Sequence, residues 1–95
     1  MFEWDDEKNR LNIEKHGISF ETAATIFRGI ILSRIDDRED YGEVRDISIG
    51  RVDTDVVVTV VHTNRDGSIL RLVSARRAIR RERKDYDEYC AQITR

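Results

Sequence analysis

Six basic side chains lie within the thirteen residues SARRAIRRERKDY, at positions 74–86 of a chain whose formal net charge is −2. Arginine guanidinium groups can hold phosphates and stabilise the negative charge that develops on a phosphorane. The alternative is a solvated helix whose arginines pair with nearby carboxylates, each pair contributing about 0.2–0.5 kcal/mol. Four of these arginines fall near an expected helix start, where the helix dipole disfavours cations, so the pattern favours a phosphate or acidic protein partner.

Two further side chains could take part in proton transfer. His62 has a side-chain type whose unperturbed pKa of about 6.5 suits activation of an RNA 2′-hydroxyl. The competing interpretation is a structural histidine at a strand end, and His16, next to Gly17, is expected to close a helix. The chain has no glycine-rich phosphate loop, paired-histidine motif or serine nucleophile motif, and its two histidines and one cysteine are too few for a recognisable zinc site. We therefore expect any nuclease chemistry to need no metal and no other cofactor.

Charge is unevenly distributed along the chain. Residues 1–43 contain eleven acidic and six basic residues, whereas residues 44–95 contain eight acidic and eleven basic ones. The basic half can attract phosphates despite an overall pI of 5.7, because charges within about 10 Å dominate at ordinary salt. With 95 residues, 38% charged and 39% hydrophobic, the chain is expected to fold as a single domain over residues 1–95. A lone Cys90 and the lack of a signal or membrane-spanning segment predict a cytoplasmic protein that is not attached to a membrane.

Helices are expected at both ends of the chain. The segment WDDEKNRLNIEKHG begins with Asp5 as a capping residue and ends at Gly17, and SFETAATIFRG runs from a capping Ser19 to Gly29. The segment from about Arg77 has apolar residues at helical spacing and predicts a C-terminal helix.

Four β-rich segments lie between these helices, at residues 30–35, 44–52, 56–63 and 68–75. Asp66 and Gly67 are typical of a two-residue hairpin turn. The predicted fold is therefore α+β, with two N-terminal helices, a four-stranded antiparallel sheet and a C-terminal helix. Counting back from the hairpin places Arg45, His62 and Arg71 in one row at the rim of the core face, and Arg76 near the edge of the opposite, more polar face.

Three ordered blocks of sequence carry a resemblance that runs nearly from end to end. They are FEWDDEKNRLNIEKHGISFETA at 2–23, DDREDYGEVRDISIG at 36–50 and RLVSARRAIRRERKDY at 71–86. In these blocks the chain resembles the BrnT family of small bacterial toxins of type II toxin–antitoxin systems. The resemblance implies a RelE/ParE-like fold and an endoribonuclease that cuts RNA and halts translation until a BrnA-like, ribbon-helix-helix antitoxin neutralises it. It also implies that operator DNA is bound only by the toxin–antitoxin complex, mostly through the antitoxin.

The resemblance and the residue types together give a hypothesis for the site. Arg76 is expected to stabilise the transition state, His62 or Tyr86 to move the proton, and five arginines to bind RNA phosphates: Arg45, Arg65, Arg71, Arg80 and Arg83. Two alternatives stay open. One is a non-catalytic module that binds an acidic partner or nucleic acid, and the other is a ParE-like gyrase inhibitor, since a fold does not fix a function.

Overall fold

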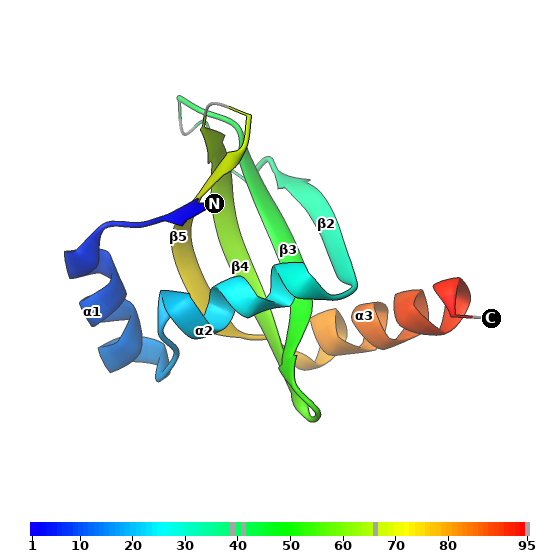
Figure 1. Ribbon diagram of the computed structural model, residues 1–95. Helices are drawn as coiled ribbons and strands as arrows, with labels where there is room; N and C mark the ends of the chain where they lie inside the picture. Colours follow the sequence, from blue (N-terminus) through cyan, green and yellow to red (C-terminus); the bar gives the residue numbers. More distant parts are fainter. Residues whose placement is uncertain (39, 41, 66, 95) are drawn as a thin grey trace.

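The computed structural model describes all residues except 39, 41, 66 and 95. Its described part contains five strands, three α-helices and one 3₁₀-helix (Figure 1). In chain order these are β1 (Phe2–Glu3), α1 (Asp6–His16), α2 (Phe20–Ala24), η1 (Thr25–Arg28), β2 (Ile31–Asp36), β3 (Arg45–Asp53), β4 (Val56–Arg65), β5 (Ile69–Arg77) and α3 (Arg80–Ile93). Among the described residues, no helix is both long and apolar enough to cross a membrane.

The strands form one mixed sheet in the order β1-β5-β4-β3-β2. The predicted four-stranded antiparallel sheet is therefore wrong, although the α+β class is confirmed. The fifth strand, β1, runs parallel to β5 and pairs Phe2 with Leu70, while the Leu70 amide donates to the carbonyl of Met1 over 3.0 Å. A two-residue strand is too short to show an alternating pattern, and its pairing covers part of the β5 edge.

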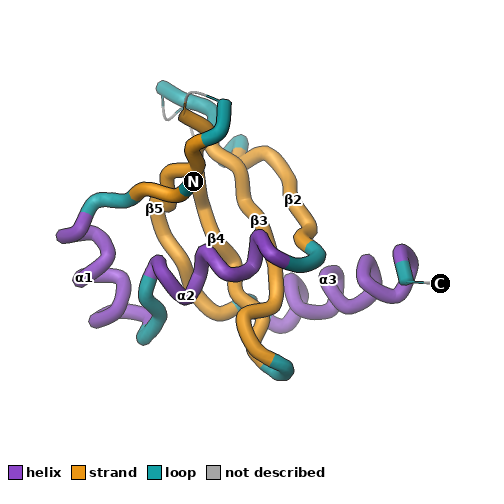
Figure 2. The backbone as a smooth tube through the Cα atoms, in the orientation of Figure 1, coloured by secondary structure: helices purple, strands orange, loops and turns teal. Residues whose placement is uncertain are grey.

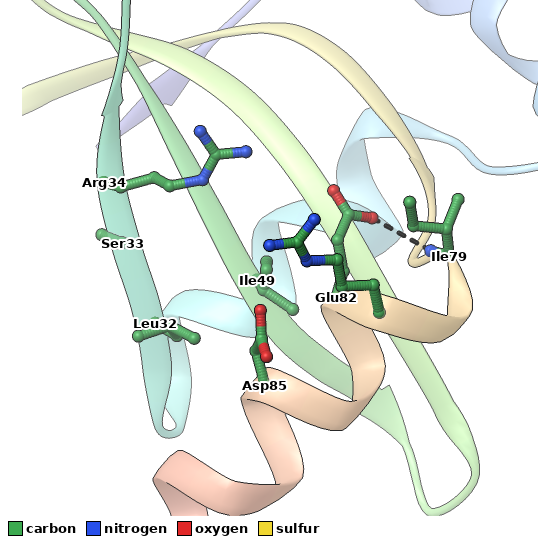
Figure 3. Close-up of a pocket in the computed structure, with 8 residues that line it drawn as sticks. Leu32, Ser33, Arg34, Ile49, Ile79, Glu82 and Asp85 are labelled. Atoms are coloured by element: carbon green, nitrogen blue, oxygen red, sulfur yellow. Dashed lines mark hydrogen bonds between the residues drawn. The ribbon is translucent and has the colours of Figure 1, made fainter.

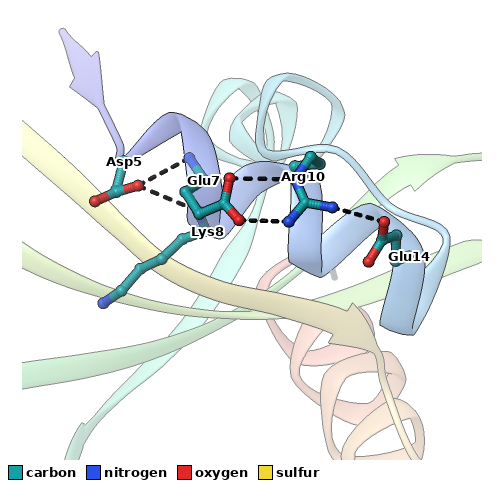
Figure 4. Close-up of polar contacts among 5 residues, drawn as sticks. All are labelled: Asp5, Glu7, Lys8, Arg10 and Glu14. Atoms are coloured by element: carbon teal, nitrogen blue, oxygen red, sulfur yellow. Dashed lines mark hydrogen bonds and ion pairs between the residues drawn. The ribbon is translucent and has the colours of Figure 1, made fainter.

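Helix α1 has the two ends that its sequence predicts. The Asp5 carboxylate accepts hydrogen bonds from the amides of Glu7 and Lys8, at 2.8 and 3.2 Å. At the other end Gly17 adopts φ 71°, and its amide donates to the carbonyl of Ile13. On the exposed surface the Arg10 guanidinium bridges two carboxylates of the same helix (Figure 4).

A buried amide attaches α1 to the sheet. The Asn12 side chain donates to the carbonyls of Ile18 and Ala75, at 2.9 and 2.8 Å, and accepts from the Ala75 amide. Leu11 and Ile13 are about half exposed. This polar attachment explains why the helix lacks a clear apolar stripe.

Helices cover both faces of the sheet (Figure 2). On one face, Phe20 and Ile26 of the α2–η1 segment pack against Val58, Val60 and Leu72. Gly50 permits this contact, because a β-carbon there would lie 2.5 Å from the Ile26 β-carbon.

The opposite face, which we call the α3 face, packs against the C-terminal helix. Tyr86 of α3 lies there against Ile49 and Val57 of the sheet. The last turns of α3 extend beyond the β2 edge (Figure 1).

The register of the β4–β5 hairpin differs from the prediction. Arg65 lies opposite Ile69 instead of Ser68, and the register shifts again between Val61 and His62. Asp66, one of the two predicted turn residues, lies outside the described residues. The expected row of Arg45, His62 and Arg71 is therefore wrong, since a bulge adds a residue to one strand and moves every later pair. The preferences of individual residues for strands and turns do not predict such a shift.

The corrected register also changes what surrounds the predicted site residues. His62 lies opposite Asp46 on one side and Leu72 on the other, and Arg71 lies opposite Thr63. Arg76 lies opposite Thr59, within β5, which continues to Arg77. Helix α3 begins at Arg80, three residues later than predicted.

Candidate functional site

A groove of about 560 Å³ lies on the α3 face, between the edge of the sheet and the first turns of α3 (Figure 3). Strands β2 and β3 contribute Leu32 and Ile49, which lie opposite each other, and the residue before α3 contributes Ile79. These apolar side chains are bordered by ionisable ones from β2 and α3: Arg34, Arg81, Glu82 and Asp85. The groove therefore combines an apolar floor with charges of both signs.

Glu82 connects three elements at one end of the groove. Its carboxylate accepts hydrogen bonds from the Ile79 amide at 3.0 Å and from Oγ1 of Thr59 at 3.0 Å. It also accepts from Nη1 and Nη2 of Arg76, at 2.7 and 2.9 Å. Burial alone would raise the pKa of this carboxyl, but the hydrogen bonds from Arg76, Ile79 and Thr59 outweigh burial and hold the pKa below its ordinary value of 4.5. Glu82 is therefore anionic, and its carboxylate accepts four hydrogen bonds from described residues.

Arg76 is held in a fixed orientation by this carboxylate. Its side chain is 38% exposed, and its only other hydrogen bond within the described chain is a 3.3 Å contact from Nη1 to the Arg77 carbonyl. The hydrogen bond to Glu82 raises the pKa of Arg76, while burial and the nearby charge of Arg38 act in the opposite direction. Since a guanidinium has five N–H donors, Arg76 keeps donors that can reach a ligand from the exposed side.

Tyr86 is buried between α3 and the sheet. It is 2% exposed, and its hydroxyl donates to the carbonyl of Ile30 over 2.8 Å. Burial, followed by a hydrogen bond with Cys90, raises the pKa of this phenol. The Arg51 guanidinium lies over the ring, 5.7 Å from its centroid. Tyr86 thus anchors α3 to the segment that precedes β2 and does not line the groove.

His62 lies on the face that η1 covers. Its Nε2 is 2.7 Å from Oγ of Ser48, which in turn is 2.6 Å from Oγ of Ser33, and its ring meets the Phe27 ring edge-on at 5.1 Å. It is 5% exposed. Burial lowers its pKa, and the opposing effect of the Asp46 charge is smaller. The structure therefore does not bring His62 together with Arg76.

The five arginines expected to bind RNA are spread over several elements. Arg71 pairs with Glu3 at 2.8 Å, and Arg45 lies 3.6 Å from Glu43. Arg83 donates to the Asp55 carbonyl over 2.7 Å, and Arg80 is exposed at the start of α3. The side chain of Arg65 lies outside the described residues. Only Arg80 and Arg83 share an element, and the others come from three different strands.

Several residues of the groove were missed by sequence reasoning. Glu82 carried a detectable signal, because a glutamate at the third helical position commonly bonds back to the capping residue. Arg34 lies two residues after Leu32 along β2 and so points to the same face of the sheet. Nothing in the local sequence indicates which residues lie across from it. Within the described ranges, no group of three or more histidine, cysteine, aspartate or glutamate side chains is arranged to hold a metal ion.

Comparison with known proteins identifies a family and a solved structure of similar fold. A family model described as the ribonuclease toxin BrnT of type II toxin–antitoxin systems matches residues 4–82. The crystal structure of the Brucella abortus ribonuclease toxin BrnT superposes with a TM-score of 0.64 and 23% sequence identity, covering 84% of this chain and 99% of that one. At that identity the superposition establishes a shared fold. No curated protein matches the sequence significantly.

Proposed function

The chain belongs to the BrnT family of ribonuclease toxins of type II toxin–antitoxin systems, and from this premise we propose that it cleaves RNA phosphodiesters without a metal ion and so inhibits translation. The endoribonuclease activity follows from membership of this family, whose members are described as ribonuclease toxins. The observation that carries the proposed mechanism is the half-exposed Arg76 guanidinium, held by Glu82 at the end of the groove.

Arg76 stabilises the transition state in this mechanism. The attacking 2′-hydroxyl makes the phosphorus pentavalent, and the extra negative charge on its oxygens is neutralised by guanidinium N–H groups that are already in position. The two hydrogen bonds to Glu82 limit rotation of the Arg76 side chain, so little reorganisation is needed during the reaction. The sheet and α3 thus supply a preorganised positive charge.

The RNA strand is held by further arginines. Arg80 and Arg83 on α3, together with Arg45, Arg65 and Arg71, are proposed to contact phosphates along the strand. Such contacts contribute affinity that falls as salt concentration rises. Proton transfer stays a proposal for His62 or Tyr86, as predicted from the sequence, although neither side chain lines the groove. Replacing each in turn, His62→Gln and Tyr86→Phe, and measuring the pH dependence of cleavage tests which of the two titrates in the reaction.

A cognate antitoxin is the partner of a type II toxin. We infer that this antitoxin is BrnA-like with a ribbon-helix-helix domain, and that operator DNA is contacted only by the complex and mainly through the antitoxin. We also propose that the reaction takes place in the cytoplasm. Copurification with the product of an adjacent short gene, followed by an operator gel-shift with and without that product, tests both parts of this inference.

The mechanism is tested by cleavage of 5′-labelled RNA in excess EDTA. Arg76→Ala is expected to cleave about 10²-fold or more slowly than the unaltered protein while keeping its circular dichroism spectrum. Arg77→Ala is the matched control, since Arg77 is the next residue of β5, is exposed, and makes no side-chain hydrogen bond to a described residue. Equal rates for the two variants would refute the role of Arg76.

The same assay, together with a DNA supercoiling assay, separates the alternatives. Cleavage that stops with EDTA and returns with Mg²⁺ would contradict the metal-independent mechanism. RNA retention without cleavage by the unaltered protein would favour a binding module, and inhibition of DNA supercoiling would favour a gyrase inhibitor.

A further inference from the structure

The groove on the α3 face has the size of a small-ligand site. Its volume of about 560 Å³ lies within the range of roughly 300–1,000 Å³ that is common for such sites. Its floor consists of Leu32 and the buried Ile49, and Ile79 at its rim is 57% exposed. A nucleobase is flat and largely apolar on its faces, so it fits a surface of this kind.

Two guanidinium groups line the groove without a carboxylate partner among the described residues. Arg34 extends from β2 across the groove (Figure 3), and Arg81 comes from the first turn of α3. Both are exposed. Several other arginines do have a carboxylate within ion-pair distance: Arg10, Arg51, Arg71, Arg76 and Arg83. Cations left without an internal partner beside a groove favour an anionic ligand from outside, and phosphate fits the paired donors of a guanidinium.

Asp85 also lines the groove, and Figure 3 shows its carboxylate directed toward the groove from α3. It makes no hydrogen bond or ion pair with any described residue, unlike Glu82, which accepts from Thr59, Arg76 and Ile79. A carboxylate repels phosphate, so its presence calls for a ligand that also has N–H donors. The Watson–Crick edge of guanine offers N1–H and N2–H side by side, which matches the two oxygens of a carboxylate.

We propose that this groove binds one guanosine nucleotide of the RNA substrate, with Asp85 accepting hydrogen bonds from the guanine edge and Arg34 and Arg81 binding its phosphates. The inference deepens the proposed function and rests on it. Because Glu82 both lines the groove and holds Arg76, the bound guanosine lies next to the phosphodiester that is cleaved. Asp85 therefore determines base preference, whereas Arg76 determines the rate for every base.

The test compares guanosine with inosine, which lacks only the N2 amino group. Substrates are ten-nucleotide RNA strands of uridine that carry three guanosines or three inosines. The unaltered protein is expected to cleave the guanosine strand about tenfold faster, the effect of losing one hydrogen bond to a charged group. Asp85→Asn is expected to cleave the guanosine strand more slowly than the unaltered protein does. Its cleavage rates for the guanosine and inosine strands should differ by less than twofold. Glu88→Gln is the matched control, because Glu88 is an exposed acidic residue of α3 that does not line the groove.

Binding provides a readout that does not depend on cleavage. The same strands with 2′-O-methyl groups cannot be cut at the 2′-oxygen, and their affinities are measured by fluorescence anisotropy. Preference for guanosine in the unaltered protein and its loss in Asp85→Asn support the site even if cleavage fails. Arg34→Ala should weaken both strands equally and reduce the salt dependence of binding. Equal affinities of the unaltered protein for guanosine and inosine strands overturn the inference, while RNA cleavage that depends on Arg76 would leave the proposed function standing.

Discussion

Replacement of Glu82 is the sharpest test of how the fold holds Arg76. In Glu82→Ala, the hydroxyl of Thr59, which is 2% exposed, loses its acceptor, and a buried unpaired group costs about 1–3 kcal/mol. The Ile79 amide loses its cap, a further loss of about 1 kcal/mol. The ion pair adds little, since Arg76 is 38% exposed and water compensates for much of its loss. We therefore expect a loss of about 3 kcal/mol in the free energy of unfolding.

Glu82→Gln separates charge from shape. The amide keeps a carbonyl oxygen for Thr59 or Ile79, but its NH₂ group meets the N–H donors of Arg76, so we expect a loss of about 2 kcal/mol. For a domain of this size each kcal/mol lowers the melting temperature by about 4–8 °C. Urea denaturation and thermal melts at pH 7 measure both variants, and Glu88→Gln again serves as the control for removing one helical carboxylate.

The pH dependence of this difference follows from the direction of the pKa shift. The pKa of Glu82 is lower in the folded protein than in the unfolded chain. Its stabilisation is therefore complete above the unfolded pKa of about 4.3 and is lost as pH falls through the folded pKa. The gap between the unaltered protein and Glu82→Gln should narrow below about pH 4.3. A gap of constant size from pH 7 to pH 3, or no gap at pH 7, would refute the reasoning.

Two further predictions concern the opposite face of the sheet. Gly50→Ala places a β-carbon 2.5 Å from the Ile26 β-carbon and is expected to lower the free energy of unfolding by about 1–3 kcal/mol. Gly29→Ala is the control, because a β-carbon there meets nothing within 4 Å and should change stability little. Equal melting temperatures for the two variants would contradict the prediction. Because burial lowers the pKa of His62 in the folded protein, the unfolded chain binds the proton at a higher pH, and the free energy of unfolding should fall as pH drops below about 6.5. In His62→Gln this pH dependence should disappear between pH 7 and the folded pKa. Urea denaturation over that range measures it, and an unchanged pH dependence in the variant would contradict the prediction.

Sequence patterns located both ends of α1 and the start of α2 because capping is local. The Asp5 carboxylate reaches amides two and three residues ahead, and Ser19 Oγ accepts from the Thr22 amide three residues ahead. Such contacts need only a few neighbouring residues, so residue type and position are enough to predict them. The three long β-rich segments were found for a similar reason, since alternation and β-branched residues mark a strand wherever it pairs.

The strand register could not be obtained in the same way. It depends on a shift between Val61 and His62 and on a turn whose length the Asp66 and Gly67 pair does not determine. A one-residue error moves every later pairing, and here it placed His62 in a row with Arg71 when Thr63 lies opposite Arg71. The short strand β1 was missed because its partner, β5, lies almost seventy residues away in the sequence.

The sequence by itself determined the family, through blocks spread over most of the chain, and the resemblance singled out Arg76 as the residue proposed for chemistry. Only the tertiary structure decided which groups surround that arginine. Thr59, Arg76 and Glu82 come from three different elements, and their contacts span 6 to 23 residues of sequence. The groove likewise joins β2 to α3, about fifty residues apart. Such contacts depend on how the sheet and helices pack together, because a site assembled from distant segments leaves no local pattern in any one of them.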